Sequence, residues 1–230
     1  MIFVEALFPG LTQLDFTGPH TVFHRIPGAE MIVASAAGGP ITSDGGLVFA
    51  GTTRLADIPR CDLLFVPGGV AATEAALDEA YLAELRRLAA TATYVTSVCT
   101  GSLILGAAGL LQGKRAACHW AWRHMLPLFG AIPDPARVVR DGDTITGGGV
   151  TAGIDFALVV AAEIAGDTVA QAIQLGIEYA PAPPFDAGRP ETAPPEVLAI
   201  IERRNAAILP VRLAQAEEAA ARLRAARPSR

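Results

Sequence analysis

The sequence places Cys99 in a setting suited to nucleophilic chemistry. A β-branched run that ends at Val98 leads directly into Cys99-Thr100-Gly101-Ser102, which begins an expected helix with small residues. In α/β proteins such a strand-to-helix junction lies at the carboxyl edge of the sheet, where ligands bind. The positive end of a helix favours a thiolate, and its free N–H groups stabilise negative charge on a substrate. The segment therefore predicts a nucleophile elbow with Cys in place of Ser.

The alternative for Cys99 is a structural cysteine buried in the core, which is a common role for a single cysteine. The other two cysteines lack the same setting, because Cys61 precedes an expected strand and Cys118 lies within one. Three sparse cysteines do not make a disulfide framework, and their spacing does not match a zinc site. We therefore expect a reducing compartment and no bound metal.

The elements that must position Cys99 alternate between strands and helices along the first 180 residues. Apolar runs predict strands at 2–8, 31–36, 62–66, 93–98 and 114–118. The spacing of apolar residues predicts helices at about 15–25, 78–90, 100–111, 120–128, 151–165 and 167–179. This alternation predicts an α/β fold in which helices cover both faces of a mostly parallel sheet.

The character of the sequence changes near residue 180. Residues 181–195 contain six prolines, which predict an extended arm, and residues 196–227 follow a helical pattern interrupted at Pro210. We therefore expect a catalytic domain over residues 1–180, followed by an arm and C-terminal helices over residues 181–230. Because the apolar stripe of these helices is thin, we expect them to pack on the body or on a second subunit.

Composition argues against several classes of partner. The formal net charge is −5 and no run of Lys and Arg lies outside the last helix, so we expect no nucleic-acid partner. No apolar stretch approaches the roughly 20 residues that a membrane span requires. The chain starts with a strand-like run and without a basic signal segment. We therefore expect a cytoplasmic protein that acts on a small molecule.

Three motifs together resemble the ThiJ/PfpI superfamily. They are Ser-Val-Cys-Thr-Gly-Ser at 97–102, Pro-Gly-Gly at 67–69, and Leu-Asp-Phe-Thr-Gly-Pro at 14–19. The likeness extends from residue 1 to about residue 179, and within the superfamily the chain is most similar to the isocyanide hydratases. The resemblance implies a flavodoxin-like fold of the class I glutamine amidotransferase type, with a mostly parallel sheet between helices.

The resemblance also implies roles for matching positions. Cys99 is the implied nucleophile, and Asp15 is the implied acidic partner, where several other superfamily members have Glu. Thr100 would supply a neighbouring hydroxyl and a backbone donor, while Gly69 and Val70 would offer amide N–H groups to the same pocket. The PfpI-type peptidases have His directly after the cysteine, so Thr100 argues against peptidase activity.

Some residues near the expected site have a second interpretation. Asp15 also fits a helix N-cap, which its position at the start of a helix favours. His119 follows a strand and could approach the thiol, although a lone His beside Trp120 also fits a packing role. The three glycines at 147–149 lack the Lys of a phosphate-binding loop, so we expect a tight turn that brings Val150 toward the pocket.

The function that the resemblance implies is hydration of isocyanides to N-substituted formamides, without a cofactor, through a covalent thioimidate on Cys99. Two alternatives remain open. One is another cysteine-dependent enzyme of the superfamily, either glyoxalase-like or an amide hydrolase. The other is a non-enzymatic domain whose cysteine senses oxidation or a ligand. The resemblance and the C-terminal tail also lead us to expect a homodimer.

Overall fold

The computed structural model describes residues 1–226, and within them eight strands form the central sheet. Their order is β3-β4-β2-β1-β5-β6-β10-β9. Their bounds are β1 (Ile2–Leu7), β2 (Glu30–Ser35), β3 (Gly39–Thr42), β4 (Val48–Arg54), β5 (Leu63–Val66), β6 (Tyr94–Val98), β9 (Val138–Asp141) and β10 (Thr144–Gly147). The six inner strands pair in parallel, whereas β3 and β9 pair antiparallel at the edges. The predicted, mostly parallel sheet is confirmed.

The direction in which strands are added to the sheet reverses beside β1. The chain passes from β1 to β2 on one side and later places β5 on the other side, after which β6 pairs with β5. In open α/β sheets, ligands bind at such a reversal, outside the carboxyl ends of the strands. The segments that follow β1, β5 and β6 therefore meet where a ligand is expected.

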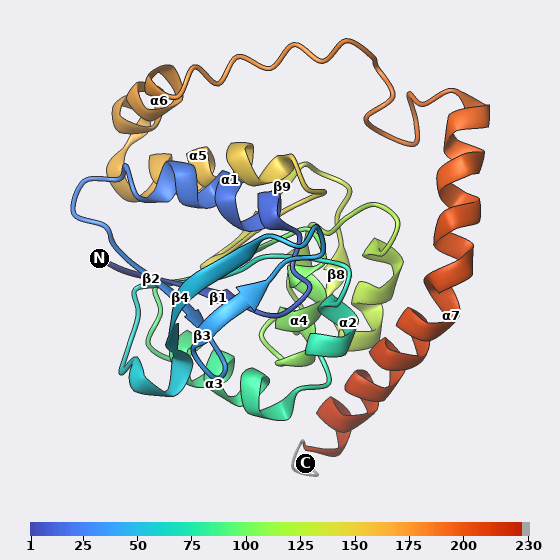
Figure 1. The fold of residues 1–230 in the computed structure, drawn as a ribbon, viewed down its shortest axis with the longest axis horizontal. Coiled ribbons are helices and arrows are strands. Elements are labelled where there is room, and N and C mark those ends of the chain that lie inside the picture. Colours follow the sequence, from blue (N-terminus) through green and yellow to red (C-terminus); the bar gives the residue numbers. More distant parts are fainter. Residues whose placement is uncertain (227–230) are drawn as a thin grey trace.

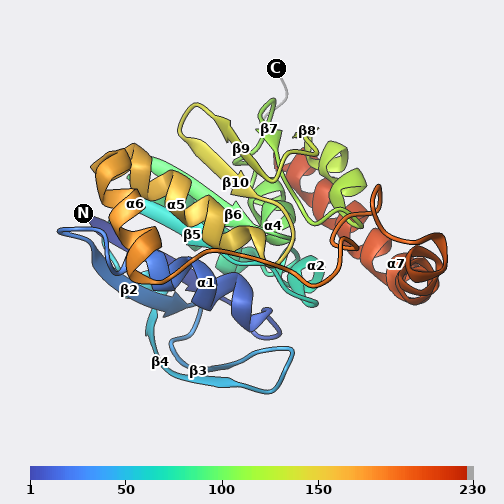
Figure 2. The same cartoon turned by 90° about the horizontal axis from the view of Figure 1, so that it is seen from above.

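Helices cover both faces of the sheet (Figure 1 and Figure 2). One face carries α1 (Gln13–Phe23), α5 (Ala152–Ala165) and α6 (Asp167–Gly176). The other face carries α2 (Ala72–Ala75), α3 (Glu79–Ala89), α4 (Gly101–Ala107) and the 3-10 helices η1 (Leu55–Asp57) and η2 (Arg123–Phe129). The predicted division between α5 and α6 at Gly166 is confirmed.

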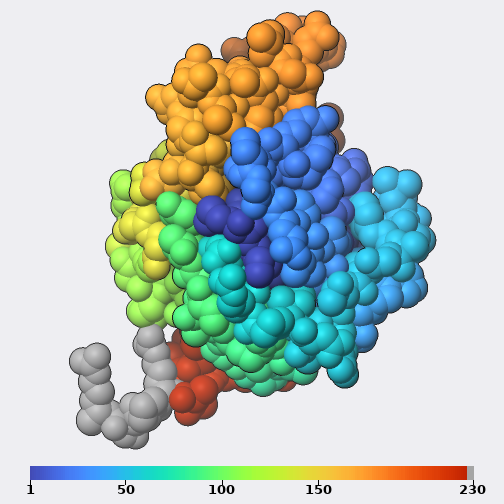
Figure 3. All heavy atoms as spheres, turned by 90° about the vertical axis from the view of Figure 1, so that its left-hand side faces the viewer, coloured from blue at the N-terminus to red at the C-terminus, as the bar shows by residue number. Residues whose placement is uncertain are grey.

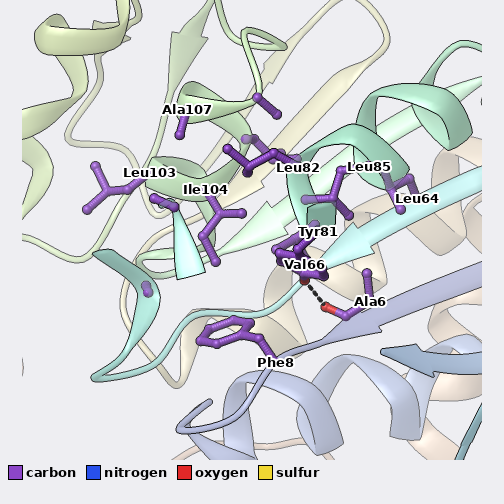
Figure 4. Close-up of a cluster of buried hydrophobic side chains, with 14 of the residues drawn as sticks. Ala6, Phe8, Leu64, Val66, Tyr81, Leu82, Leu85, Leu103, Ile104 and Ala107 are labelled. Carbon is purple, nitrogen blue, oxygen red and sulfur yellow. Dashed lines mark hydrogen bonds between the residues drawn. The ribbon is translucent and has the colours of Figure 1, made fainter. Parts of the chain in front are cut away.

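Each face of the sheet has its own apolar cluster. Figure 4 shows part of the cluster under α3 and α4, to which Leu64 of β5, Leu85 of α3 and Ile104 of α4 all belong. Within it the buried Tyr81 hydroxyl donates a hydrogen bond to Ala6 O at 2.7 Å, so its polar group is satisfied. This packing fixes α4, and with it the turn that precedes the helix, against the sheet.

The cluster on the opposite face contains a group of three phenylalanines. Phe23 of α1, Phe65 of β5 and Phe156 of α5 have ring centroids 5.7 to 5.9 Å apart. All three are buried, and such aromatic pairs stabilise a core beyond the area they bury. The group therefore holds α1 beside α5 and fixes the loop between β1 and α1 at the edge of the sheet.

The predicted strand at 114–118 is largely wrong. Only β7 (Arg115–Ala116) forms, and it pairs with β8 (Ile132–Pro133) outside the main sheet. Beyond β7, side chains form the hydrogen bonds that a neighbouring strand would otherwise form with the backbone. The Ser102 hydroxyl donates to Ala117 O at 2.6 Å, and Ala117 N–H donates to Thr146 Oγ1 at 2.8 Å. The chain therefore leaves the sheet direction at Ala117.

The predicted helix at 120–128 is the 3-10 helix η2 rather than an α-helix. Pro127 lies inside it, and a proline has no N–H to donate to a regular α-helical bond. The turn ends at Gly130, whose φ of 74° places it in the left-handed region that glycine tolerates. This segment packs against α4 and against the C-terminal helix.

The C-terminal segment leaves the body and returns to it. Residues 181–194 form an exposed arm without helix or strand, which runs from α6 across to α7 (Pro195–Ala225) (Figure 1). The helix α7 is continuous, so the predicted interruption at Pro210 is wrong. After the proline, the buried Ala216 and Ala220 join the apolar cluster that also contains α4, and these contacts hold the helix in place.

Seen from the side, the segment around α6 (orange) and the visible part of α7 (red) lie at opposite ends of the body (Figure 3).

Arg227, the last residue of the predicted helical pattern, and the rest of the tail to residue 230 lie outside the described residues. No helix within residues 1–226 combines the length and the apolar character needed to cross a membrane.

Candidate active site

Cys99 lies at the turn between β6 and α4, and its backbone adopts an uncommon conformation. Its φ of 55° lies in the left-handed region, which costs a residue with a side chain about 1–2 kcal/mol. Hydrogen bonds offset this strain, because the Cys99 N–H is shared between Gly147 O at 3.1 Å and Gly148 O at 2.7 Å. The side chain is 5% exposed. This strained turn, which opens onto a cavity, has the geometry expected of a nucleophile elbow.

Two glycines allow the chain segments of the site to approach one another. A Cβ at Gly101 would collide with the carbonyl oxygen of Val66, so the first residue of α4 lies directly against the end of β5. A Cβ at Gly68 would lie 2.6 Å from Asp15 Oδ2 and 2.8 Å from Cys99 Cβ. Position 68 therefore brings the segments that follow β1, β5 and β6 into contact.

The structure decides between the two interpretations of Asp15. The N-cap position of α1 belongs to Thr12, and Asp15 lies inside the helix with its side chain fully buried. Among residues 1–226 neither carboxyl oxygen has a hydrogen-bond partner of regular geometry, and the polar groups that they face are the Cys99 thiol and the Gly68 N–H. The N-cap interpretation is therefore wrong, and the carboxyl group lies beside the thiol.

Burial changes the acidity of both groups. It raises the pKa of Asp15 to about 7, although the Cys99 thiol and the Gly68 N–H act in the opposite direction. Burial also raises the pKa of Cys99 well above its usual value, and the charges of Asp15 and Cys118 raise it further, whereas the Thr100 N–H lowers it. Both shifts disfavour a negative charge, so burial opposes the simultaneous ionisation of Asp15 and Cys99.

Thr100 connects the cysteine turn to the loop after β5. Its hydroxyl donates to Gly69 O at 3.0 Å and accepts a hydrogen bond from Gly69 N–H at 2.9 Å. The Gly69 N–H is thus occupied, and the prediction that it donates into the pocket is wrong. The Val70 N–H, in contrast, forms no hydrogen bond within residues 1–226, and the Val70 side chain is half exposed.

A cavity of about 460 Å³ opens above Cys99. Its volume falls within the range of about 300–1,000 Å³ that is typical of small-molecule sites. The predicted residues that line it are Gly69, Val70, Cys99, Thr100, His119 and Val150. Asp15 reaches the thiol from the fully buried side. The site predicted from the sequence is thus brought together in space.

His119 lies in the cavity wall as a neutral side chain. Burial lowers its pKa, and the positive charge of Arg212 lowers it further. Its Nδ1 accepts a hydrogen bond from Ala121 N–H at 3.2 Å, which leaves the proton on Nε2, and its ring stacks on Trp120. Among residues 1–226 no three His, Cys, Asp or Glu side chains come close enough together to hold a metal ion.

Comparison with known proteins places the chain in a family. The sequence model of the DJ-1/PfpI family matches residues 3–163, which include Asp15, Gly68 and Cys99. The chain belongs to the DJ-1/PfpI family. This confirms the resemblance that the three sequence motifs carry.

Relatives of this DJ-1/PfpI protein include an enzyme and a regulator. It is 52% identical to the isonitrile hydratase of Pseudomonas putida over 217 residues, which are 94% of this chain and 95% of that enzyme. It is 33% identical to the HTH-type transcriptional regulator CdhR of Pseudomonas aeruginosa over 174 residues, 71% of this chain and 51% of the regulator. A ThiJ/PfpI family protein from Pseudomonas syringae has a similar structure, with a TM-score of 0.89, 42% identity, and coverage of 95% of this chain and 90% of that one.

One wall of the cavity lies outside the segment matched by the DJ-1/PfpI family. It comes from the arm and from α7, which contributes the apolar residues Val197, Leu198, Ile201 and Ile208. Arg212 of the same helix and Trp122 also line the cavity. Sequence reasoning missed these residues, because the apolar stripe of α7 predicts packing but gives no sign of what the helix packs against.

Proposed function

We propose that this protein hydrates isocyanides to N-substituted formamides, with Cys99 as the nucleophile. The observation that carries the proposal is the 52% identity to an isonitrile hydratase over nearly the whole length of both chains, isonitrile being another name for isocyanide. The buried pair of Asp15 and Cys99, next to a cavity with an apolar wall on α7, supports it, because the isocyanide carbon accepts a soft nucleophile such as sulfur.

In the first step, the Cys99 thiol gives its proton to Asp15, and the resulting thiolate attacks the terminal carbon of R–N≡C. A C–S bond forms, and the carbon takes up the proton that Asp15 holds. The product is a thioimidate, R–N=CH–S–Cys99, in which every atom of both reactants is retained. Asp15 suits this role because its pKa, raised to about 7, makes its carboxylate a stronger base than an exposed Asp.

In the second step, water adds to the thioimidate carbon while Asp15 takes one of its protons and passes that proton to the substrate nitrogen, which leaves Asp15 as a carboxylate again. The adduct R–NH–CH(OH)–S–Cys99 then breaks its C–S bond and releases R–NH–CHO. The hydroxyl proton returns to the sulfur and restores the thiol. One isocyanide and one water give one formamide, so this scheme needs no oxidant, reductant or cofactor.

Residues in the cavity wall are proposed to bind the substrate. The Val70 N–H is available as a donor because it forms no hydrogen bond within residues 1–226. Neutral His119 offers its Nε2 proton, and Val150 borders the cavity beside it. Thr100 and Gly69 hold the loop after β5 against the cysteine turn through their paired hydrogen bonds.

The test is intact-protein mass spectrometry with a simple aryl isocyanide, while formamide is followed by chromatography. We expect catalytic formamide and, after rapid quenching, a mass increase of one isocyanide that maps to Cys99. Cys99→Ala should abolish both signals. Cys61→Ala is the matched control and should keep turnover, because Cys61 is buried against Leu88 rather than in the cavity.

Other outcomes distinguish the alternatives. Substantial formamide from Cys99→Ala would overturn the covalent scheme. Oxidation or alkylation at Cys99 without any formamide would remove the hydratase proposal and favour a sensor. Turnover of glyoxal-type aldehydes or amides in place of isocyanides would favour another cysteine enzyme of the family.

We also propose a cytoplasmic homodimer in which residues 1–180 form the catalytic domain and residues 181–230 form an arm and a helical segment that packs on the body or on the second subunit. The exposed apolar side chains Leu175 of α6, Phe185 of the arm, and Ile200 and Val211 of α7 support an interface along these segments. The three free, buried cysteines fit a reducing compartment. Sedimentation at micromolar concentration should give the dimer mass, and a monomer alone would overturn this proposal.

A further inference from the structure

Arg212 reaches the cavity from α7 and is held there by two contacts. Its Nη2 donates a hydrogen bond to Val70 O at 2.9 Å, and its guanidinium carbon lies 4.2 Å from the centre of the Trp122 ring. Both partners line the same cavity as Cys99. The ring contact and the hydrogen bond together hold the guanidinium, so its positive charge stays at a fixed place in the wall of the cavity.

The charged and titratable groups around Cys99 come from several elements. Asp15 of α1 faces the sulfur from the buried side, Cys118 lies beside it, and neutral His119 lies in the cavity wall. Asp44 lines the cavity and accepts a hydrogen bond from the Thr12 hydroxyl at 2.5 Å. The cavity also contains Arg189 and Arg204, but both are exposed, whereas Arg212 is partly buried.

The proposed reaction creates negative charge, but none of the residues assigned to it so far carries a positive charge. The charge forms first on the sulfur and then on the attacked isocyanide carbon, while Asp15 is itself an acid and Thr100 is neutral. A fixed cation in the wall of a cavity stabilises such charge more than a mobile, fully hydrated one.

We propose that Arg212 is a positioning residue that stabilises the negative charge on Cys99 and on the attacked carbon during hydration. The inference rests on the proposed function and deepens it, because it assigns part of the reaction to a helix outside the segment matched by the family. The place of Arg212 in the same cavity wall as Cys99, where Val70 O and the Trp122 ring hold it, agrees with this role. Arg212 stays charged despite its burial, since a guanidinium does not lose its proton in proteins.

The test compares Arg212→Met, which removes the charge and keeps an apolar side chain of similar length, with Arg212→Lys, which keeps the charge. Arg222→Met is the matched control. Arg222 lies on the same helix, donates to a backbone carbonyl, Leu77 O, at 3.0 Å, and pairs with Glu218 away from the cavity. All three variants alter a contact between α7 and the body, and only Arg212→Met removes a positive charge from the cavity that Cys99 lines.

Two measurements are made on each variant: kcat/KM for isocyanide hydration, and the rate of Cys99 alkylation by neutral iodoacetamide as a function of pH. Arg212→Met should lower kcat/KM by about tenfold or more, mainly through kcat, and shift the alkylation midpoint upward by about one pH unit. Arg212→Lys should keep most of the activity and of the midpoint, and Arg222→Met should match the wild type.

The proposal is overturned if Arg212→Met leaves both readouts unchanged, or if Arg212→Lys is as impaired as Arg212→Met, because a lost contact rather than a lost charge would then explain the effect. Alkylation does not depend on turnover. If the wild type hydrates no isocyanide, the proposed function fails, while the alkylation profile still reports whether Arg212 acts on Cys99.

Discussion

The carboxyl group of Asp15 faces the thiol of Cys99 across a space that a glycine at position 68 leaves open. The two residues come from different strand-to-helix connections, after β1 and after β6, and both are buried. Each residue shifts the pKa of the other. Both are placed at a cost in stability, because Cys99 has a positive φ and Asp15 is a buried acid without a regular hydrogen bond. Such arrangements are typical of reactive sites.

Gly68→Ala should separate the reacting pair. Its Cβ would lie 2.6 Å from Asp15 Oδ2 and from Thr100 N, so one of these groups must move. Because a misplacement of about 1 Å can cost roughly 100-fold in rate, we expect a loss of that order in kcat/KM. The control is Gly51→Ala, where a Cβ meets no atom within 4 Å. Equal activity of both variants would contradict the close packing of the pair.

Asp15→Asn should slow hydration by about 100-fold or more, since general acid–base catalysis by one group contributes roughly 10²- to 10⁴-fold. The fold should remain intact because Asp15 does not cap α1. Steady-state kinetics and circular dichroism check the two statements. An active variant would show that Asp15 moves no proton in the reaction.

The same substitution should change how stability depends on pH. The folded pKa of Asp15 is raised to about 7, whereas an unfolded Asp titrates near about 3.9. The folded state therefore binds this proton more tightly, and the wild type loses stability as pH rises from about 4 to about 7. Asp15→Asn should be more stable than the wild type above pH 7 and not at pH 4. Thermal melts at both pH values test this, and parallel curves would contradict it.

Ile201→Ala should alter the preference for the substituent R. Ile201 lines the cavity, whereas its neighbour Ile200 is 55% exposed and lies outside the wall, which makes Ile200→Ala the matched control. Loss of apolar contact should lower kcat/KM for a cyclohexyl-sized isocyanide by about tenfold or more and have little effect on methyl isocyanide. If both isocyanides were affected alike, the α7 wall would not contact R.

The pair formed by buried Glu5 and partly exposed His20 should make stability fall at alkaline pH. Glu5 Oε2 lies 2.6 Å from His20 Nδ1, and this bond raises the pKa of His20, while burial raises the pKa of Glu5. His20 contributes fully to the free energy of unfolding below its unfolded pKa of about 6.5. This contribution is lost as pH rises through the higher folded pKa, because the buried carboxylate of Glu5 then has no cation beside it. Glu5→Gln should weaken this dependence.

Melting temperatures between pH 6 and pH 9 measure the effect of Glu5→Gln. The control is Glu30→Gln, which removes an exposed carboxylate on the neighbouring strand β2 and should keep the dependence of the wild type. An unchanged slope in Glu5→Gln would mean that another group sets the alkaline limit of stability.

The position of Cys99 could be predicted because its signal is local. One short stretch contains a β-branched strand, a helix start of small residues, and Gly101. The topology of α/β folds places such a junction at the carboxyl edge of the sheet. The role of Asp15 could not be decided in the same way. An N-cap and a buried acid share the same local pattern, and only the pairing of β1 with β5, which in turn pairs with β6, separates them.

Local sequence patterns could not predict that the Gly69 N–H is occupied or that α7 forms a wall of the cavity, for another reason. Both depend on which distant side chains meet: Thr100 meets Gly69, and α7 returns to the body through an arm that follows no repeating geometry. The short strand β7 shows the same limit, because the hydroxyls of Ser102 and Thr146 redirect a chain whose composition favours a strand.

The N-terminal half of α7, from residue 195 to residue 208, meets the reacting pair only across open space. Its side chains can therefore be exchanged without disturbing the strained turn at Cys99 or the buried acid behind it. Under the proposed roles, preference for R lies in residues 195–208, whereas the chemistry lies in Asp15, Cys99 and Arg212. A new substrate preference can then evolve in the first half of α7 while the chemistry is inherited intact.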